Sequence, residues 1–356
     1  MSISEKKKQS IKKHILELID KDKKNIVSSI QGTFEISATT VYRYLSELIQ
    51  NEIIAKDSRR KSKYKLCEKE ILFSYYPLEQ QLEEDIIYDR DIFPLLDKIS
   101  GEAQKIWYHS FTEIMNNAID HASAKEIKCG LYQNSLNTTI LIRDDGIGIF
   151  NKIVEYNKNV LGKEITQDDA VGELFAGKFT TDRNNHSGEG IFFTSRLMDK
   201  FIIYSDGRYF SHDSYDSEQL LNFFEMESNK NFDILIKQKG TIVMMVLSNC
   251  SRRKIDEVLN TFSDPDRGFF KTQILIKNVI PNGDPVSRSQ AKRLYNNFDK
   301  FEEVELDFSG IDNIGQAFTH ELFIVFKRNH PQIELIVKNA NKKVTDMISR
   351  VKNTAC

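Results

Sequence analysis

The sequence predicts an α+β protein made of three segments of different character. Near the N-terminus, apolar residues at helical spacing precede a short hairpin-like stretch. In the middle, one long helix is followed by strands that end in glycine-rich turns, and toward the C-terminus strands and helices alternate. Of 356 residues, 40% are hydrophobic and 29% are charged, which is typical of a globular chain with two or three domains.

The charge of the chain is uneven along its length. Residues 1–67 carry 15 Lys or Arg against 8 Asp or Glu, a formal charge of +7, and the rest carries −9 because the whole chain carries −2. A basic segment on an acidic body indicates a polyanionic partner. Four cysteines without a CxxC pattern argue against a zinc site and fit a reducing compartment. The longest apolar run, 242–247, is too short to span a bilayer, so we expect a cytoplasmic protein with no membrane partner.

The first segment, residues 1–67, opens with three helical stretches. Apolar residues form helical stripes over 11–20 and 37–50, and a short helix between them is expected to end at Gly32. Ser37 is expected to cap the third helix, because a serine hydroxyl can accept a hydrogen bond from a free N–H group of the first turn. The pattern therefore predicts a small helical domain.

A hairpin follows these helices, with strand-like residues at 53–55 and 63–66 around a charged turn. Three helices and a hairpin resemble a winged helix-turn-helix, which implies that the third helix enters the major groove of DNA and that the wing contacts phosphates. The exposed face of the third helix is expected to include Tyr44 as well. We expect DNA contacts from Thr39, Thr40, Tyr42, Arg43, Arg59, Arg60, Lys61 and Lys63. A solvated domain that binds protein is the alternative.

Residues 68–100 are expected to connect the first segment to the second. The stretch YYPLEQQLEED is typical of a loop, and Pro94 interrupts or starts a helix. The long helix of the second segment is expected to begin near Gly101.

The stretch EIMNNAIDHA, residues 113–122, places polar side chains along one face of this long helix. Glu113, Asn117 and Asp120 fall at i, i+4 and i+7, opposite apolar residues that would pack against a sheet. An amide oxygen together with phosphate oxygens suits a hard cation such as Mg²⁺, and a carboxylate one turn earlier can orient or deprotonate a water. A plain surface stripe on an amphipathic helix explains this stretch equally well.

Glycine-rich turns follow at three places downstream. The strand within 138–150 ends in Asp144-Asp145-Gly146-Ile147-Gly148, where the first Asp can accept a hydrogen bond from an exocyclic amine. Gly188 and Gly190 precede an apolar helix, and the free N–H groups at a helix N-terminus bind phosphate. A further strand, 239–248, opens with Gly240-Thr241.

These pieces, in this order, resemble the GHKL ATPase superfamily of DNA gyrase, Hsp90, histidine kinases and MutL, over residues 80 to 250. One box alone is common, whereas four boxes in order on the expected elements are specific. The N-box is matched by Glu113, Asn116, Asn117 and Asp120, the DxGxG box by Asp144, Gly146 and Gly148, the second glycine box by Gly188, Gly190 and Ile191 after Phe179-Thr180-Thr181, and the last box by Gly240-Thr241. The resemblance implies a Bergerat-type α/β sandwich that binds ATP and Mg²⁺.

The resemblance also implies a role for individual residues. Asn117 would hold Mg²⁺, Glu113 would activate the attacking water, and Asp144 would bond the adenine amino group with Thr241 nearby. The implied nucleotide-binding residues are Asn116, Asn117, Asp120, Asp144, Gly146, Gly148, Lys178, Thr180, Thr181, Gly188, Glu189, Gly190, Ile191 and Thr241. Residues 150–190 would form a lid, in which Lys178 and Arg183 either neutralise phosphate charge or are ordinary loop charges. His121 is expected to pack or cap rather than catalyse.

The third segment begins near residue 268, and its strands and helices alternate as in a small α/β domain. The stretch 306–318 resembles the STAS-like domain that follows GHKL modules in some bacterial regulators. In the STAS domains of anti-anti-sigma factors, a phosphorylated Ser or Thr begins the helix after this strand. Here that place reads Ile314-Gly315-Gln316, although Ser309 and Thr319 are neighbours. We therefore expect a docking domain without chemistry of its own.

The combined prediction is a winged helix at 1–67, a connector at 68–100, a Bergerat-type ATP-binding domain at 101–250 and a STAS-like α/β domain at 268–356. It describes a cytoplasmic regulator, an ATPase, that couples Mg-ATP binding and hydrolysis to DNA binding and to docking of a protein partner. A homodimer is compatible with these folds. The alternatives are an anti-sigma-type serine/threonine kinase and a module that binds ATP without turnover. A sensor histidine kinase is disfavoured, because His14 and His109 are poorly placed as phosphoacceptors.

Overall fold

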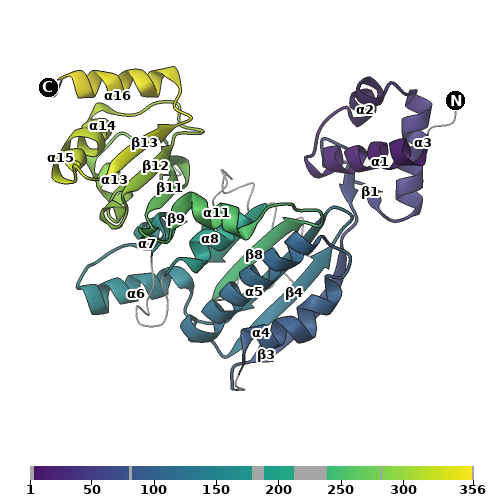
Figure 1. Cartoon of the computed structure of the whole chain (residues 1–356), viewed down its shortest axis with the longest axis horizontal. Coiled ribbons are helices and arrows are strands. Elements are labelled where there is room, and N and C mark those ends of the chain that lie inside the picture. Colours follow the sequence, from purple (N-terminus) through teal and green to yellow (C-terminus); the bar gives the residue numbers. More distant parts are fainter. Residues whose placement is uncertain (1–3, 80–81, 179–187, 212–238, 281–282, 355–356) are drawn as a thin grey trace.

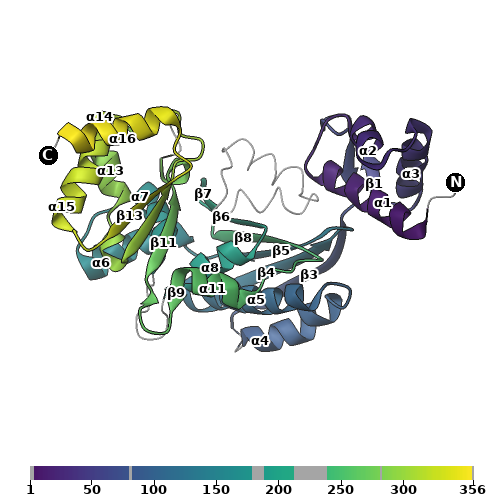
Figure 2. The same ribbon diagram turned by 45° about the horizontal axis from the view of Figure 1, so that its top comes forward.

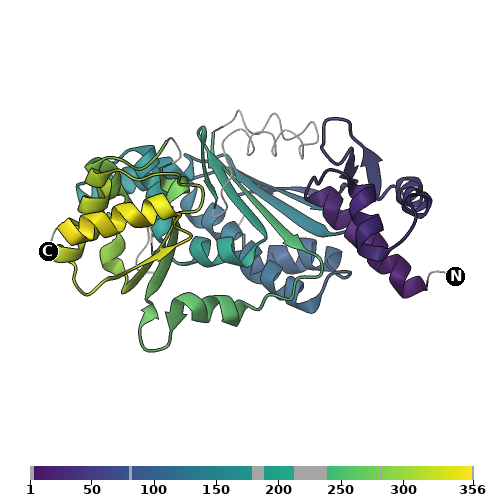
Figure 3. The same cartoon turned by 90° about the horizontal axis from the view of Figure 1, so that it is seen from above.

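The computed structural model describes residues 4–79, 82–178, 188–211, 239–280 and 283–354. A large sheet occupies the centre, with the N-terminal helices beyond one end and the C-terminal α/β domain beyond the other (Figure 1). The two chain termini lie at opposite ends of the molecule in every view (Figure 2 and Figure 3). No helix among the described residues is long and apolar enough to cross a membrane.

The N-terminal domain has the expected order of three helices and a hairpin. Its elements are α1 (Glu5–Asp20), α2 (Ile26–Phe34), α3 (Ala38–Gln50) and the antiparallel strands β1 (Ile54–Lys56) and β2 (Tyr64–Leu66). The Ser37 hydroxyl accepts from the Thr40 N–H at 3.2 Å, which confirms the predicted cap. Helix α2 runs past Gly32 to Phe34, because Glu35 adopts the left-handed conformation that ends it. That this domain is a winged helix that reads DNA stays a prediction.

Strand β3 (Lys69–Pro77) contradicts the loop expected within the connector. It pairs antiparallel with β4 (Glu126–Gln133) and forms one edge of the central sheet. The chain then forms α4 (Glu84–Ile87), a π-helical turn (Tyr88–Ile92) and a 3₁₀ turn (Phe93–Leu95), which contribute Tyr88 and Ile92 to the core. The strand was missed because an edge strand carries exposed residues, here Lys69 and Tyr75, that blur the alternation.

The central domain is a two-layer α/β sandwich, as the sequence predicted. Its sheet is antiparallel throughout, in the order β3-β4-β5-β8-β6-β7, and the remaining strands are β5 (Asn137–Asp144), β6 (Lys200–Ser205), β7 (Arg208–Ser211) and β8 (Thr241–Ser248). Helix α5 (Gly101–His121) lies across one face of this sheet (Figure 1). Side chains of β5 alternate, so that Ile140 and Ile142 join the core beneath α5 whereas Leu141 joins the cluster on the other face.

Two helices, α6 (Ile149–Leu161) and α7 (Gln167–Ala176), occupy most of the predicted lid, and α8 (Gly190–Leu197) follows the second glycine box. After β8, helix α11 (Ile255–Phe262) and the short hairpin of β9 (Ser263–Asp264) and β10 (Gly268–Phe269) lead into the C-terminal domain. Figure 3 shows α11 and this hairpin passing beneath the junction between the two domains.

The C-terminal domain is built on a parallel three-stranded sheet, in the order β11 (Lys271–Leu275), β12 (Glu303–Asp307) and β13 (Glu334–Lys338). Strand β11 ends at Leu275, and α12 begins at the next residue. The helical elements are α12 (Ile276–Val279), α13 (Arg288–Leu294), a 3₁₀ turn (Phe298–Lys300), α14 (Gln316–His320), a π-helical turn (Glu321–Phe326), α15 (Lys327–Asn329) and α16 (Lys342–Thr354). Alternating parallel strands and helices confirm the predicted small α/β domain.

Candidate functional site

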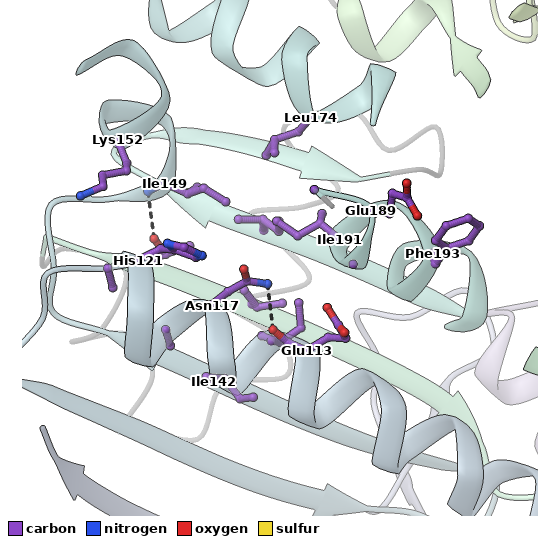
Figure 4. Close-up of a pocket in the computed structure, with 18 of the residues that line it drawn as sticks. Glu113, Asn117, His121, Ile142, Ile149, Lys152, Leu174, Glu189, Ile191 and Phe193 are labelled. Carbon is purple, nitrogen blue, oxygen red and sulfur yellow. Dashed lines mark hydrogen bonds between the residues drawn. The ribbon is translucent and has the colours of Figure 1, made fainter. Parts of the chain in front are cut away.

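A pocket of about 570 Å³ lies between α5, the sheet and the N-terminal end of α8 (Figure 4). This volume is in the range of sites for nucleotide-sized ligands. Its walls include residues from all four sequence boxes: Glu113, Asn117, Asp144, Gly148, Gly188, Glu189, Gly190, Ile191 and Thr241. The fold therefore brings together groups that are far apart in the sequence.

Asp144 lies at the end of β5, at one end of this pocket. Its side chain is only 5% exposed, and its Oδ1 accepts from the Gly146 N–H at 2.9 Å and from the Thr241 N–H at 3.3 Å. Burial raises the pKa of this carboxyl, and the backbone N–H groups oppose that rise. The Thr241 hydroxyl accepts from the Ile149 N–H at 3.0 Å. Two N–H groups thus hold the Asp144 carboxyl in one orientation, which suits recognition of an amino group.

Gly146 of the DxGxG box and Gly240 of the last box allow close packing of chain segments. A Cβ atom on Gly146 would lie 2.0 Å from the Ala122 carbonyl oxygen, and one on Gly240 would lie 2.1 Å from the Asp144 carbonyl oxygen. Gly148 has φ +88° and lines the pocket. We expected both glycines of this box to approach a ligand, but Gly146 instead lets the strand end press against the C-terminal end of α5.

The polar face of α5 presents Asn117 and Glu113 to the pocket (Figure 4). Asn117 Nδ2 donates to the Glu113 carbonyl oxygen at 2.8 Å, so its Oδ1 is the atom that can serve a cation. The Glu113 carboxylate lies against the start of α8, because a Cβ on Gly190 would come within 1.9 Å of Glu113 Oε2. The Glu189 side chain makes no cap bond to α8, so the first N–H groups of this helix can bind an anion.

Three titratable residues line the pocket that the sequence reasoning did not assign to the site: His109, His121 and Lys152. With Glu113 and Asn117, the two histidines form a row at successive i+4 positions of α5, and this spacing was the available signal. Burial lowers the pKa of His109, although nearby Glu113 opposes this effect. Its Nε2 is buried and has no hydrogen-bond partner among the described residues. Burial thus disfavours the charged form of the His109 imidazole, which lies one turn from Glu113.

Four of the residues implied for nucleotide binding do not line this pocket: Asn116, Asp120, Gly146 and Lys178. Asp120 is exposed. The pocket is lined by α5 residues four positions apart, whereas we placed Asp120 in the site because it lies seven positions after Glu113. Lys178 is directed to the C-terminal domain, where its Nζ donates to the Lys300 carbonyl oxygen at 2.9 Å and lies 4.8 Å from the Phe301 ring centroid. Phe179, Thr180, Thr181 and Arg183 lie outside the described residues.

The residues expected to contact DNA divide into two groups. Thr39, Tyr42, Arg43, Arg59, Lys61 and Lys63 are exposed, and Thr40 is partly exposed. Arg60 instead binds back to the C-terminal end of α1, where its guanidinium donates to the carbonyl oxygens of Ile19 and Asp20. Tyr44, expected on the exposed face, is buried because it falls on the core side of α3 with Val41 and Leu48. Arg60 and Tyr44 are therefore not available for the contacts with DNA that the sequence suggested.

The C-terminal domain has no accessible hydroxyl at the position of the STAS phosphoacceptor. Ile314 is buried there, and Thr319 is fully buried with its hydroxyl donating to the Gly315 carbonyl oxygen at 2.9 Å. Ser309 is half-buried after the end of β12. This geometry disfavours phosphorylation at that position.

The comparisons with known proteins identify two domains in the chain. Residues 102–248 match the family model described as histidine kinase-, DNA gyrase B-, and HSP90-like ATPase. Residues 290–345 match the model of a STAS-like domain of unknown function. A search of curated proteins found no match. The matched ATPase family implies nucleotide binding, usually with Mg²⁺. The pocket between α5 and α8 thus belongs to a GHKL-type ATPase domain, which this chain joins to a C-terminal STAS-like domain.

Proposed function

We propose that this protein is an ATP-dependent regulator that binds and hydrolyses Mg-ATP in its central pocket. The observation that carries the proposal is the meeting of Glu113, Asn117 and Asp144 with the uncapped N-terminus of α8 in one cavity. Changes at this site would alter DNA binding by the N-terminal domain and docking of a protein by the C-terminal domain. Fold alone does not assign a reaction, so the support lies in these side chains.

Each residue of the pocket has a chemical task in this proposal. Asp144 would accept a hydrogen bond from the adenine amino group, and the N–H groups of α8 would bind phosphate oxygens. Asn117 Oδ1 would hold Mg²⁺, which neutralises phosphate charge when bound. The Glu113 carboxylate would accept the proton of the attacking water, and a neutral His109 would not form an ion pair with it.

The charge of the lining supports a role for the cation. Glu113, Asp144 and Glu189 carry carboxyl groups, whereas Lys152 is the one lysine in the described lining. A bare triphosphate would be repelled by this lining, and a divalent ion would offset the repulsion. We therefore expect chelation of Mg²⁺ to abolish phosphate release and to weaken nucleotide binding.

Two substitutions test the proposal directly. Glu113→Gln should retain Mg-ATP binding, measured by calorimetry, and lower phosphate release by about 10²- to 10⁴-fold, because it removes the general base. Asp144→Asn should lose binding itself, because the amide presents an NH₂ group to the adenine amine. Both variants should unfold at the wild-type temperature. Normal turnover by Glu113→Gln would show that the base has been assigned wrongly.

A protein kinase of the anti-sigma type is the second candidate, and a module that binds ATP without turnover is the third. The buried Ile314 and Thr319 disfavour phosphorylation within the C-terminal domain, so a kinase would have to act on a partner. Radiolabelled ATP that marks a co-expressed protein would support the kinase, whereas release of inorganic phosphate without a partner supports the ATPase.

DNA binding through residues 1–67 is tested by replacing the exposed wing residues Arg59, Lys61 and Lys63 with Ala. Binding should weaken on all sequences, and its dependence on salt should fall by about one counterion for each lost phosphate contact. Thr33→Ala, on the exposed part of α2, is the matched control and should bind normally. Binding that does not depend on salt would indicate a protein partner instead.

A further inference from the structure

One end of the pocket is built by residues outside the matched ATPase domain. The pocket runs along α5 from His121 to His109, about 18 Å at 1.5 Å per residue. Asp144 lies at the His121 end, since the Ile147 N–H donates to the Ala122 carbonyl oxygen at 3.1 Å. Figure 4 places Glu113 and Phe193 at the opposite end. Leu259 and Ser263, from α11 and β9, also line the pocket.

Aromatic contacts place α11 at the Glu113 end and fasten it to α8. The Phe192 ring of α8 lies 5.1 Å from Phe262 of α11 and 4.5 Å from Phe269 of β10. The Phe193 ring, which adjoins the pocket, lies 5.2 Å from Phe269. Because Ser263 directly follows Phe262, its position at this end is set by the same cluster.

A buried arginine strengthens this connection between α8 and the C-terminal sheet. The Arg196 guanidinium lies 3.3 Å from the Phe192 ring centroid, and its Nη2 donates to the carbonyl oxygen of Gln273 in β11 at 2.9 Å. Burial lowers the pKa of Arg196 to about 9, so the group is still charged at neutral pH. A movement of α8 away from β11 would leave this buried charge with fewer acceptors. Helix α8 and β11 are therefore expected to move together.

We infer that Ser263 and Leu259 complete the terminal-phosphate end of the pocket, so that the segment leading into the C-terminal domain distinguishes a nucleoside triphosphate from a diphosphate. The inference rests on the proposed nucleotide function of this pocket. The Ser263 hydroxyl donates to the Leu259 carbonyl oxygen at 2.8 Å. A serine hydroxyl can rotate and donate to a phosphate oxygen instead. A diphosphate would not reach this end, so only the triphosphate would change the contacts of the segment that enters the C-terminal sheet.

The test compares Ser263→Ala with two matched variants of the full chain. Thr261→Ala removes the same kind of bond, from Thr261 Oγ1 to the Glu257 carbonyl oxygen at 2.8 Å, on the exposed side of α11. Ser263→Thr keeps the hydroxyl. Affinities for a non-hydrolysable ATP analogue and for ADP are measured by calorimetry with Mg²⁺. Ser263→Ala should bind the analogue about tenfold more weakly and ADP equally well, because a bond to a charged phosphate is lost.

Thr261→Ala and Ser263→Thr should keep the wild-type ratio of the two affinities. Hydrogen exchange of residues 255–275 should be slower with the analogue than with ADP in the wild type, and this difference should vanish in Ser263→Ala. An unchanged affinity ratio in Ser263→Ala would overturn the inference. A wild-type protein that binds neither nucleotide would instead refute the proposed function.

Discussion

The two outer domains are attached to the ATPase domain in different ways. The C-terminal domain shares a hydrophobic core with it, since Phe192 and Phe193 of α8 pack in one cluster with Phe269 and Ile274. A hydrogen bond also joins the C-terminal domain to helix α7 of the predicted lid, because Asn296 Nδ2 donates to Glu173 Oε1 at 3.0 Å. The N-terminal domain has a core of its own, formed by residues of α1, α2, α3 and β1.

Among the described residues, the N-terminal domain is joined to the sheet by the chain itself, by one packed leucine and by polar contacts. Strand β2 continues almost directly into β3, Leu136 in the β4–β5 turn packs against the N-terminal core, and Asn137 Nδ2 donates to Asp20 Oδ1 at 3.3 Å. Close-packed cores transmit displacement, whereas a half-exposed polar contact yields to it. A change at α8 should therefore reach the C-terminal domain first.

The largest effect that tests this comparison is expected from Phe262→Ala. Phe262 is 7% exposed and packs in the shared cluster, so the cavity should lower the free energy of unfolding by about 3–5 kcal/mol. Urea unfolding followed by the fluorescence of Trp107, the single tryptophan, reports on the ATPase core. If the substitution destabilised only the C-terminal domain and left the unfolding transition reported by Trp107 unchanged, the two cores would unfold independently.

Leu136→Ala is the corresponding substitution at the N-terminal connection. Leu136 is only partly buried, so its truncation should lower the free energy of unfolding by about 1 kcal/mol. The loss should appear in the unfolding of the N-terminal domain, measured by hydrogen exchange of α1 and α3. An effect as large as that of Phe262→Ala would contradict the contrast between the two attachments.

Between pH 7.5 and 5.5, acid should destabilise the ATPase domain through His109. The pKa of His109 is lower in the folded protein than its ordinary value of about 6.5, so the unfolded chain binds more protons below that pH. The contribution of His109 to stability is thus complete above pH 6.5 and falls as the pH decreases. Between pH 7.5 and 5.5, the free energy of unfolding should fall less in His109→Gln than in the wild type. An equal fall in both proteins would exclude His109 as its source.

The smallest effect is expected from Asn137→Ala, which removes the hydrogen bond to Asp20. Both residues are partly exposed, so stability should change by less than about 0.5 kcal/mol. Differential scanning calorimetry should show nearly the wild-type transition. A large shift would mean that this contact, rather than the shared core, couples the domains.

Much of the fold followed from local patterns in the sequence. The cap at Ser37, the start of α5 at Gly101 and the strand before Asp144 all lie where local patterns predicted them. Strand β3 did not, because its pairing with β4 is a contact across many residues that its own composition does not reveal. The same holds for Arg60, whose binding to α1 depends on where the hairpin folds.

The sequence by itself identified several residues that meet in the pocket, among them Glu113, Asn117 and Asp144, because four boxes in order are specific although one box alone is common. Tertiary structure alone decided which neighbours they have. It placed His109 and Lys152 in the lining, turned Lys178 toward the C-terminal domain, and brought Ser263 to the Glu113 end. The physical reason is that a motif is local, whereas a cavity wall is made wherever distant segments pack against one another.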